Sequence, residues 1–436
     1  MDEEPMKSTL LPSTNVAMAY ASDVARLGRD AVGTQDDVWL ILSHALGRLA
    51  VLREVELRQT AIQAADALAV HALALGLTRD SMVLRAASAL RALHDEASTI
   101  PGTDHDHALA ELVIATQAVV VDQELSGAFE LAYATLHGLL SSFGSRLSPR
   151  QRGNVLSQQG RAVRQLGVWD AARDLYQEAM DLGYESDAMD VVARALLGVA
   201  VIALTRGNYP LAREEFERAL ANAVRANDPE LIRLAHHGLF NCGFTSGDLD
   251  SAMVHGWNVL RLCIAPDSRA EALMNMAEIC RLTGEHDAAM RVYVVAMEWT
   301  SQPKVRLHAM SGALQSAIAV GRLADARRYM TGIATLLPTV PDTYTRASVG
   351  IEVADSLHRL GDHAAASGQL AEAQTLAAEH SYHELVHRAE QASAAWHVPA
   401  LPVESEAKDT RRKRTRRSED FRTVLRSLNG LTAAAR

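Results

Sequence analysis

The sequence predicts an all-α protein, a solenoid of about seven helical hairpins with a helical N-terminal region in front of them. Three observations support this: the composition, an alanine that recurs at nearly constant spacing, and a glycine at a fixed distance before each such alanine. Apolar residues make up 48% of the 436 residues and aromatic residues only 5%. This composition favours close-packed helices, because strands prefer aromatic and β-branched side chains.

The recurring alanines are 40, 40, 40, 37, 37 and 40 residues apart, and a glycine lies five residues before each of them. We call them the anchor alanines: Ala132, Ala172, Ala212, Ala252, Ala289, Ala326 and Ala366. The glycines are Gly127, Gly167, Gly207, Gly247, Gly284, Gly321 and Gly361. A glycine can end a helix in the left-handed conformation, and an alanine lets two helices approach closely. Each repeat is therefore predicted to be a helix, a glycine turn and a second helix.

Apolar residues after the anchors predict the buried face of each second helix. Larger apolar residues stand four residues after six anchors, at Leu136, Tyr176, Phe216, Tyr293, Met330 and Leu370. This position shares one helix face with the anchor, since the α-helical period is 3.6 residues. The fourth repeat departs from the pattern, because Gly256 stands where the large residue is expected. Such hairpins cannot bury their apolar faces alone, so stacking them makes one continuous core.

This pattern resembles the tetratricopeptide repeat family from roughly Leu112 to Ala378. It departs from the family in its period of 37–40 residues, in Gly256, and in mostly lacking the proline that ends the family motif. Long periods of this kind are similar to the repeat domains of bacterial regulators, including peptide-pheromone receptors and large transcriptional activators. The resemblance implies a right-handed superhelical solenoid that holds a protein or peptide in a concave groove lined by the first helix of each repeat.

The chain divides into five predicted segments. They are a disordered N-terminus (1–15), a helical N-terminal region or degenerate repeats (16–104), the repeat array (105–395), a linker with a basic run (396–417) and a short amphipathic C-terminal helix (418–436). In the last segment, Ser418 is a candidate N-cap, and Phe421, Val424, Leu425 and Leu428 share one face. Gly430 is expected to end this helix, which we interpret as a docking element.

Charge is distributed unevenly along the chain. The net charge is −10, but residues after 407 carry +7 and residues 1–407 carry −17. An acidic body of this kind would repel phosphates, which disfavours general nucleic-acid binding outside the tail. The acidic N-terminus has no apolar targeting segment, and no stretch is long and apolar enough to span a membrane. Three cysteines without metal-ligand spacing indicate a reducing compartment, so we expect a cytoplasmic protein with no membrane partner.

No motif for catalysis, a cofactor or a metal is present. The sequence lacks a P-loop, a dinucleotide-binding glycine motif, HExxH, GxSxG and a CxxC pair, so we do not expect an enzyme. Asp104, His105, Asp106 and His107 could supply metal ligands. We interpret them instead as a polar loop between helices, because adjacent residues rarely converge on one ion.

The resemblance places candidate ligand contacts on the first helix of each repeat, facing the groove. They are Ser157, Arg161, Arg164, His237, Asn241, Phe244, Met274, Glu278, Arg281, Gln315, Asp355 and His358. Asn and Gln amides can pair with any peptide backbone, because they both donate and accept hydrogen bonds. Arg161 and Arg164 form a cationic pair one helical turn apart, which would suit a carboxylate. The alternative is that these are ordinary solvated residues of a repeat surface.

The basic run has three open interpretations: a solvated tail, a contact with an acidic partner or with the chain's own acidic body, or a contact with nucleic acid. Its members are Arg411, Arg412, Lys413, Arg414, Arg416 and Arg417. The leading hypothesis for function is a protein- or peptide-binding scaffold or receptor that acts as an adaptor or regulator. The alternative is a nucleic-acid-associated transcriptional regulator that uses the basic C-terminal tail. Association of identical chains stays open.

Overall fold

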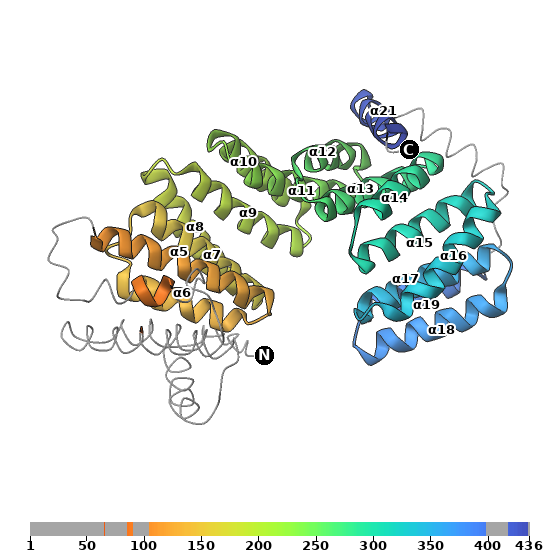
Figure 1. The fold of residues 1–436 in the computed structure, drawn as a ribbon, viewed down its shortest axis with the longest axis horizontal. Coiled ribbons are helices and arrows are strands. Elements are labelled where there is room, and N and C mark those ends of the chain that lie inside the picture. The colour runs from red at the N-terminus through yellow and green to blue at the C-terminus, as the bar shows by residue number, and fades with distance from the viewer. Residues whose placement is uncertain (1–64, 66–84, 90–103, 398–416, 435–436) are drawn as a thin grey trace, which may run out of the picture. The chain divides into compact units, whose positions relative to one another are not determined.

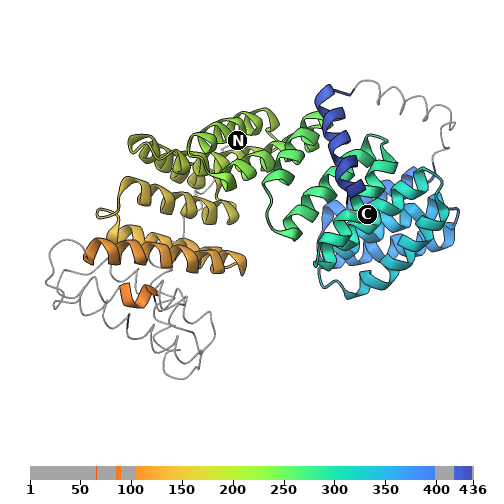
Figure 2. The same cartoon turned by 45° about the horizontal axis from the view of Figure 1, so that its top comes forward.

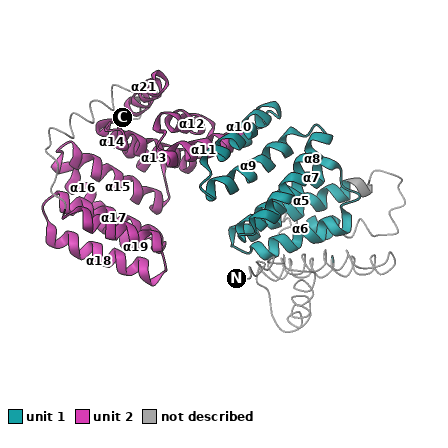
Figure 3. Ribbon diagram, turned by 180° about the vertical axis from the view of Figure 1, so that it is seen from behind, with its two compact units in different colours: residues 1–231 teal, residues 232–436 magenta. Residues whose placement is uncertain are grey.

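The computed structural model describes residues 65, 85–89, 104–397 and 417–434. It forms two compact units, unit 1 comprising residues 1–231 and unit 2 comprising residues 232–436 (Figure 3). The predictions for 1–15, for nearly all of 16–104, and for 398–416 lie outside the described residues.

Every regular element in the described parts of the chain is helical (Figure 1). In unit 1 these are α5 (Asp104–Leu125), α6 (Phe129–Phe143), α7 (Pro149–Gln165), α8 (Trp169–Glu185), α9 (Met189–Thr205) and α10 (Tyr209–Arg225). Unit 2 begins within α11 (Pro229–Ser246) and continues with α12 (Leu249–Leu262), α13 (Pro266–Leu282), α14 (His286–Trp299), α15 (Pro303–Ala319) and α16 (Leu323–Leu336). It ends with η1 (Leu337–Thr339), α17 (Thr343–Arg359), α18 (His363–Glu379), α19 (His383–Ala395) and α21 (Glu419–Ala434). None of the helices in these ranges is long and apolar enough to cross a membrane.

The predicted glycine turns and anchor alanines are confirmed. All seven glycines have φ between +73° and +86°, and each joins the two helices of one hairpin from α5/α6 to α17/α18. All seven anchor alanines are fully buried, with 0% exposure. The left-handed residue and the close helix approach are therefore used in every repeat, as the spacing predicts.

Glycines in the first helices make room for the large residue of the second helix. A Cβ atom added to Gly198 would lie 2.1 Å from Cζ of Tyr176, and one added to Gly160 would lie 2.9 Å from Cε1 of the same ring. Tyr176 thus packs between α7 and α9 against bare backbone. Tyr293 packs in the same way on Gly312 of α15, where an added Cβ would lie 2.2 Å from Cζ of the ring.

From α8 to α14, the two repeat periods follow from the length of the second helix. α8, α10 and α18 have 17 residues each, whereas α12 and α14 have 14. The difference of three residues is nearly one helical turn and equals the difference between the 40- and 37-residue spacings. α16 also has 14 residues, but the three-residue helix η1 follows it and the spacing returns to 40.

The missing large residue of the fourth repeat is replaced from neighbouring helices. A Cβ atom on Gly256 of α12 would lie 3.1 Å from Cγ of Met276 and 3.2 Å from Cδ2 of Phe240. Phe240 comes from α11 and Met276 from α13, and both are buried. Side chains of the adjacent first helices therefore occupy the space that Tyr176 or Tyr293 fills in other repeats.

Two local predictions are wrong. Residues 104–107 are not a loop, because they form the first turn of α5. Gly430 does not end the last helix, which continues to Ala434. A glycine inside a helix costs about 1 kcal/mol relative to alanine. Here the residues beyond Gly430 make tertiary contacts that offset it, since Thr432 is buried and Leu431 packs against the core of unit 2.

The last helix, α21, packs against α12 and α14 (Figures 1 and 2). Its Phe421, Val424 and Leu428 are buried, so the predicted apolar face is confirmed. The predicted cap is also confirmed, because the backbone N–H of Phe421 donates to Oγ of Ser418 at 3.1 Å.

Candidate functional site

Unit 2 presents a row of polar side chains at one repeat position of its first helices. Asn241 on α11, Glu278 on α13, Gln315 on α15 and Asp355 on α17 each stand eleven residues before an anchor alanine. All four are half-buried. We call them the polar column, and the accessible side of the helices that carry them the first-helix face. Because α13 contacts α15 and α15 contacts α17, the column is continuous from Glu278 to Asp355.

An ion pair fixes the middle of the column. Nε of Arg281 donates to Oε2 of Glu278 at 2.8 Å, and a second guanidinium nitrogen bonds the other carboxylate oxygen. The hydroxyl of Tyr293 donates to the same Oε2 at 2.7 Å. Burial alone would raise the pKa of Glu278, but the hydrogen bonds and charge of Arg281 outweigh it and hold the pKa below its usual range. Glu278 is therefore an ionised, rigidly oriented carboxylate.

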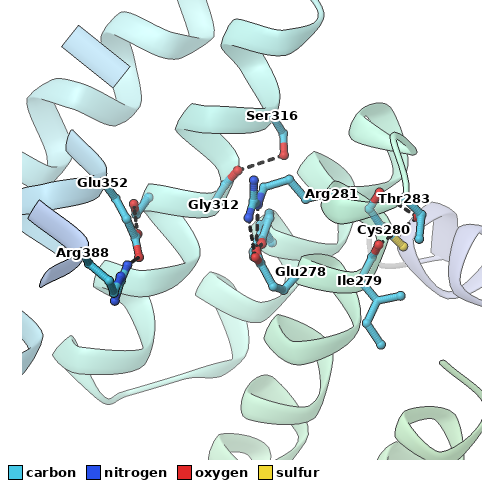
Figure 4. A network of polar contacts seen from close by, with 11 residues as sticks. Glu278, Ile279, Cys280, Arg281, Thr283, Gly312, Ser316, Glu352 and Arg388 are labelled. Carbon is cyan, nitrogen blue, oxygen red and sulfur yellow. Dashed lines mark hydrogen bonds and ion pairs between the residues drawn. The ribbon is translucent and has the colours of Figure 1, made fainter. Parts of the chain in front are cut away.

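A second network ties three neighbouring first helices together (Figure 4). On α17, Glu352 accepts a hydrogen bond from the hydroxyl of Ser311 on α15 and pairs with Arg388 of α19, with Nη2 3.5 Å from Oε1. Arg388 also donates to Oγ of Ser348 at 3.2 Å. The half-buried His308 of α15 interacts electrostatically with both Glu278 and Glu352, and burial lowers its pKa although Glu352 opposes this. The face thus holds alternating charges that are already compensated.

Three predicted residues at the start of unit 2 form an aromatic and apolar edge. The exposed ring of His237 stacks on Phe240 with centroids 6.4 Å apart, and Phe240 stacks on Phe244 at 5.8 Å. Phe244 and Met274 are half-buried and pack against the core. They offer apolar contact area beside Asn241.

At the other end, Asp355 and His358 hold Trp396. The indole N–H of Trp396 donates to Oδ1 of Asp355 at 3.4 Å, and the ring stacks on His358 with centroids 4.6 Å apart. His358 also shares a hydrogen bond with His363, with the two Nδ1 atoms 3.1 Å apart. Both predicted residues therefore help to pack the segment after α19.

In unit 1, the structure places Arg161 and Arg164 on α7 but buries Ser157. Arg161 pairs with Glu124 of α5 at 3.3 Å, and Arg164 hydrogen-bonds Tyr176. Burial raises the pKa of Glu124, and the two arginines counteract this. Ser157 is only 2% exposed, and its hydroxyl has no hydrogen-bond partner among the residues that the structure describes. The prediction that Ser157 faces a ligand is wrong, because its short side chain stays inside the packed interface.

Of the basic run, the structure describes Arg417. Its Nη1 donates to Oδ1 of Asp250 at 2.9 Å, and the backbone N–H of Ser418 donates to Oδ2 of Asp250 at 2.6 Å. This residue therefore contacts the chain's own acidic body, one of the three interpretations of the run. Arg411, Arg412, Lys413, Arg414 and Arg416 lie outside the described residues.

Several residues of the face were not predicted, namely Tyr293, His308, Ser311, Glu352 and Arg388. A signal for some of them existed. Ser311 and Glu352 are 41 residues apart and Ser348 and Arg388 are 40 apart, so each pair is separated by about one repeat. Polar residues one period apart on first helices are candidates for contact.

Comparison with known proteins supports the repeat assignment. Residues 151–223, which cover α7 to most of α10, match the family model described as tetratricopeptide repeat. This chain contains tetratricopeptide repeats. No curated protein matches it in sequence.

Solved structures with tetratricopeptide folds resemble it at low identity. A signal transduction ATPase with numerous domains and a tetratricopeptide repeat sensor, from Pyrococcus horikoshii, is 15% identical with a TM-score of 0.53 over 81% of this chain and 55% of that chain. Aspartyl phosphate phosphatase F from Bacillus subtilis is 10% identical with a TM-score of 0.47, over 79% of this chain and 95% of that chain. A Rap protein complexed with competence and sporulation factor is 11% identical with a TM-score of 0.43, over 86% and 99% of the two chains. The first of these supports the helical-repeat fold.

Proposed function

We propose that this chain is a protein- or peptide-binding scaffold or receptor that acts as an adaptor or regulator by holding an extended segment on the first-helix face of unit 2. The observation that carries the proposal is the polar column. Its two amides, Asn241 and Gln315, flank the Glu278–Arg281 pair, and neither has a hydrogen-bond partner within the described parts of the chain. Repeat arrays commonly use such extended faces for binding. The proposed role is binding, not catalysis.

The two kinds of side chain in the column would do different things. Asn241 and Gln315 can each donate to and accept from a peptide backbone, so they would bind a strand-like segment independently of its sequence. Glu278 is held by Arg281 and Tyr293, so little side-chain entropy would be lost when a ligand contacts it. The amides would supply affinity. The fixed charges of Glu278 and Arg281 would set the register of a ligand that carries both positive and negative side chains.

A selected peptide tests this proposal. Random peptides displayed on phage would be selected on the immobilised full chain, and the dissociation constant of the best free peptide measured by calorimetry. Asn241→Ala and Gln315→Ala should each weaken binding about 2- to 10-fold, the range for one lost hydrogen bond. Arg327→Ala, on the exposed side of α16, is the matched control and should leave affinity unchanged. Equal affinity for all three variants, each with a native thermal transition, would remove the polar column from the binding site.

The nucleic-acid alternative rests on the basic run and is tested separately. A fluorescent DNA duplex titrated at physiological salt should bind the wild type if the run contacts phosphates, with an affinity that falls steeply with added salt. Replacing Arg411, Arg412, Lys413 and Arg414 by Gln should then abolish retention. No binding by the wild type under these conditions would remove the alternative.

A further inference from the structure

The outward side of α12 and α14 differs from that of α8, α10, α16 and α18. One and five residues after the anchor, α12 carries Met253 and Trp257, and α14 carries Met290 and Val294. From α8 to α18 the same positions otherwise hold Arg173 and Gln177, Arg213 and Glu217, Arg327 and Thr331, and Ser367 and Ala371, whereas in α6 they hold Tyr133 and His137. Polar or small residues are expected there, because this side of a second helix faces solvent. Two adjacent repeats therefore carry an apolar outer face, which we call the α12/α14 face.

The helix α21 covers this face. Met253 and Met290 are 0% and 5% exposed, and they belong to the same buried cluster as Phe421, Val424 and Leu428. The opposite side of α21 carries exposed charges, with Arg426 paired to Glu419 within the helix. The chain thus buries one stripe of an amphipathic helix on the α12/α14 face.

Polar contacts fix the direction and register of α21. Asp250, near the start of α12, accepts from the Arg417 guanidinium at 2.9 Å and from the Ser418 N–H at 2.6 Å. One carboxylate thus pairs with the cation that precedes α21 and with a donor at its N-terminus, where negative charge is favourable. Farther along, Arg291 of α14 donates to Oδ1 of Asn429 at 2.7 Å. The face therefore contacts three features of α21: the cation that precedes the helix, the apolar stripe, and the amide oxygen of Asn429, which follows the stripe within the helix.

We propose that the α12/α14 face is a docking site that the α21 of a second copy of this chain can fill, so that two chains exchange their C-terminal helices. An uncovered face would expose Met253 and Met290, so some amphipathic helix has to occupy it. The helix shown to fit it is α21, which every copy carries.

Chain connectivity allows the exchange. α21 is separated from α19, which ends at Ala395, by residues 396–418. A stretch of this length can span at most about 75 Å when extended, at roughly 3.3 Å per residue, which permits a seat on another molecule. Swapping an identical element satisfies the same contacts in trans as in cis, so it needs no new surface. This inference is independent of the proposed peptide-binding role, which concerns the opposite set of helices.

Two charge reversals separate exchange from attachment within one chain. In Asp250→Arg, the face repels its own Arg417, and in Arg417→Asp, the tail repels its own Asp250. Neither variant alone can pair, within one chain or between two of its copies. In an equimolar mixture of the two variants, exchange of the helices gives one pair of wild-type charges, Asp250 with Arg417, and one pair with the two charges reversed. Each face then meets a helix of opposite charge. The double variant Asp250→Arg/Arg417→Asp restores pairing within one chain and is the control.

Light scattering during gel filtration measures the mass. Tryptophan fluorescence measures whether the face is covered, because Trp257, one of five tryptophans, is half-buried against the cluster that includes the apolar stripe of α21. Each single variant should be monomeric with a red-shifted emission. The mixture should double in mass and recover the wild-type emission, and the double variant should match the wild type in both mass and emission. A mixture that shows the two monomers unchanged would overturn the proposal. If a single variant loses helical signal, recovery of that signal as a dimer on mixing supports exchange, and no recovery overturns it.

Discussion

Gly312 on α15 is the position where one added methyl group should have the largest effect in unit 2. A Cβ atom there would lie 2.2 Å from Cζ and 2.3 Å from the hydroxyl oxygen of Tyr293, a side chain that is only 1% exposed. Gly312→Ala would gain about 0.8–1 kcal/mol in helix propensity. Overpacking a tight core costs about 1–3 kcal/mol, and an overlap this deep lies at the upper end. The expected net loss in the free energy of unfolding is therefore about 1–2 kcal/mol.

The matched control is the same substitution where space is open. Gly368 lies within α18 and has no atom within 4 Å of the added Cβ, so Gly368→Ala should raise stability by about 0.5–1 kcal/mol. Urea unfolding followed by circular dichroism would measure both variants, with an unchanged m-value showing that the transition is comparable. The reasoning would be refuted if Gly312→Ala were as stable as the wild type or more stable. In that case Tyr293 would not be wedged against the α15 backbone.

Three further predictions concern the column and the last helix. Tyr293→Phe removes the hydroxyl that donates to Glu278, so the pKa of Glu278, measured by NMR titration, should rise and stability should fall by about 1–2 kcal/mol; an unchanged pKa would contradict the bond. Burial alone would raise the pKa of Asp250, but hydrogen bonds from Ser418 and Arg417 hold it below its usual value near 3.9. Its stabilising effect on α21 is therefore complete above about pH 4 and is lost as the pH falls through the lowered pKa, so Trp257 emission should shift red in acid. Asp250→Asn should remove most of this pH dependence. An acid transition identical to that of the wild type would argue against the stabilisation of α21 by Asp250. Leu428→Ala, at a fully buried position, should cost about 2–4 kcal/mol and release α21, visible as faster amide exchange in residues 419–434; protection equal to the wild type would contradict this.

The repeat architecture could be predicted because its rules are local. A left-handed glycine and a fully buried alanine five residues later each need only a few neighbouring residues, and they recur in every hairpin. The side-chain packing around Gly256 could not be predicted in this way. Its missing volume comes from Phe240 and Met276, which are sixteen and twenty residues away and lie on different helices.

The candidate site was predicted in outline but not in its contacts. The helical period places Asn241, Glu278 and Gln315 at one repeat position, and the structure leaves all three half-buried. The same reasoning fails for Ser157, since periodicity indicates a direction and not the depth of packing around a short side chain. The partner of Glu278 from the next helix, Tyr293, was interpreted as a core residue, because sequence alone does not show that its hydroxyl reaches the face.

The seat of α21 had a sequence signal that was not used. Met253 and Met290 interrupt a position that is otherwise arginine or serine in the repeats from α8 to α18. Such a break in a polar position indicates that something covers the two helices, but it does not say what. Identifying α21 as the cover requires pairing Asp250 with Arg417, a contact over 167 residues that no repeat spacing predicts.

The replacement of volume around Gly256 limits how this protein can be redesigned. Consensus design treats each column of a repeat alignment as independent and would place a large apolar residue such as leucine or tyrosine at position 256. In this chain the space beside Gly256 of α12 is already filled by Phe240 of α11 and Met276 of α13. A productive change would have to be concerted, with a smaller residue at 240 introduced together with the larger one at 256. The fourth repeat is therefore not interchangeable with its neighbours, although its glycine turn and anchor alanine are the same as theirs.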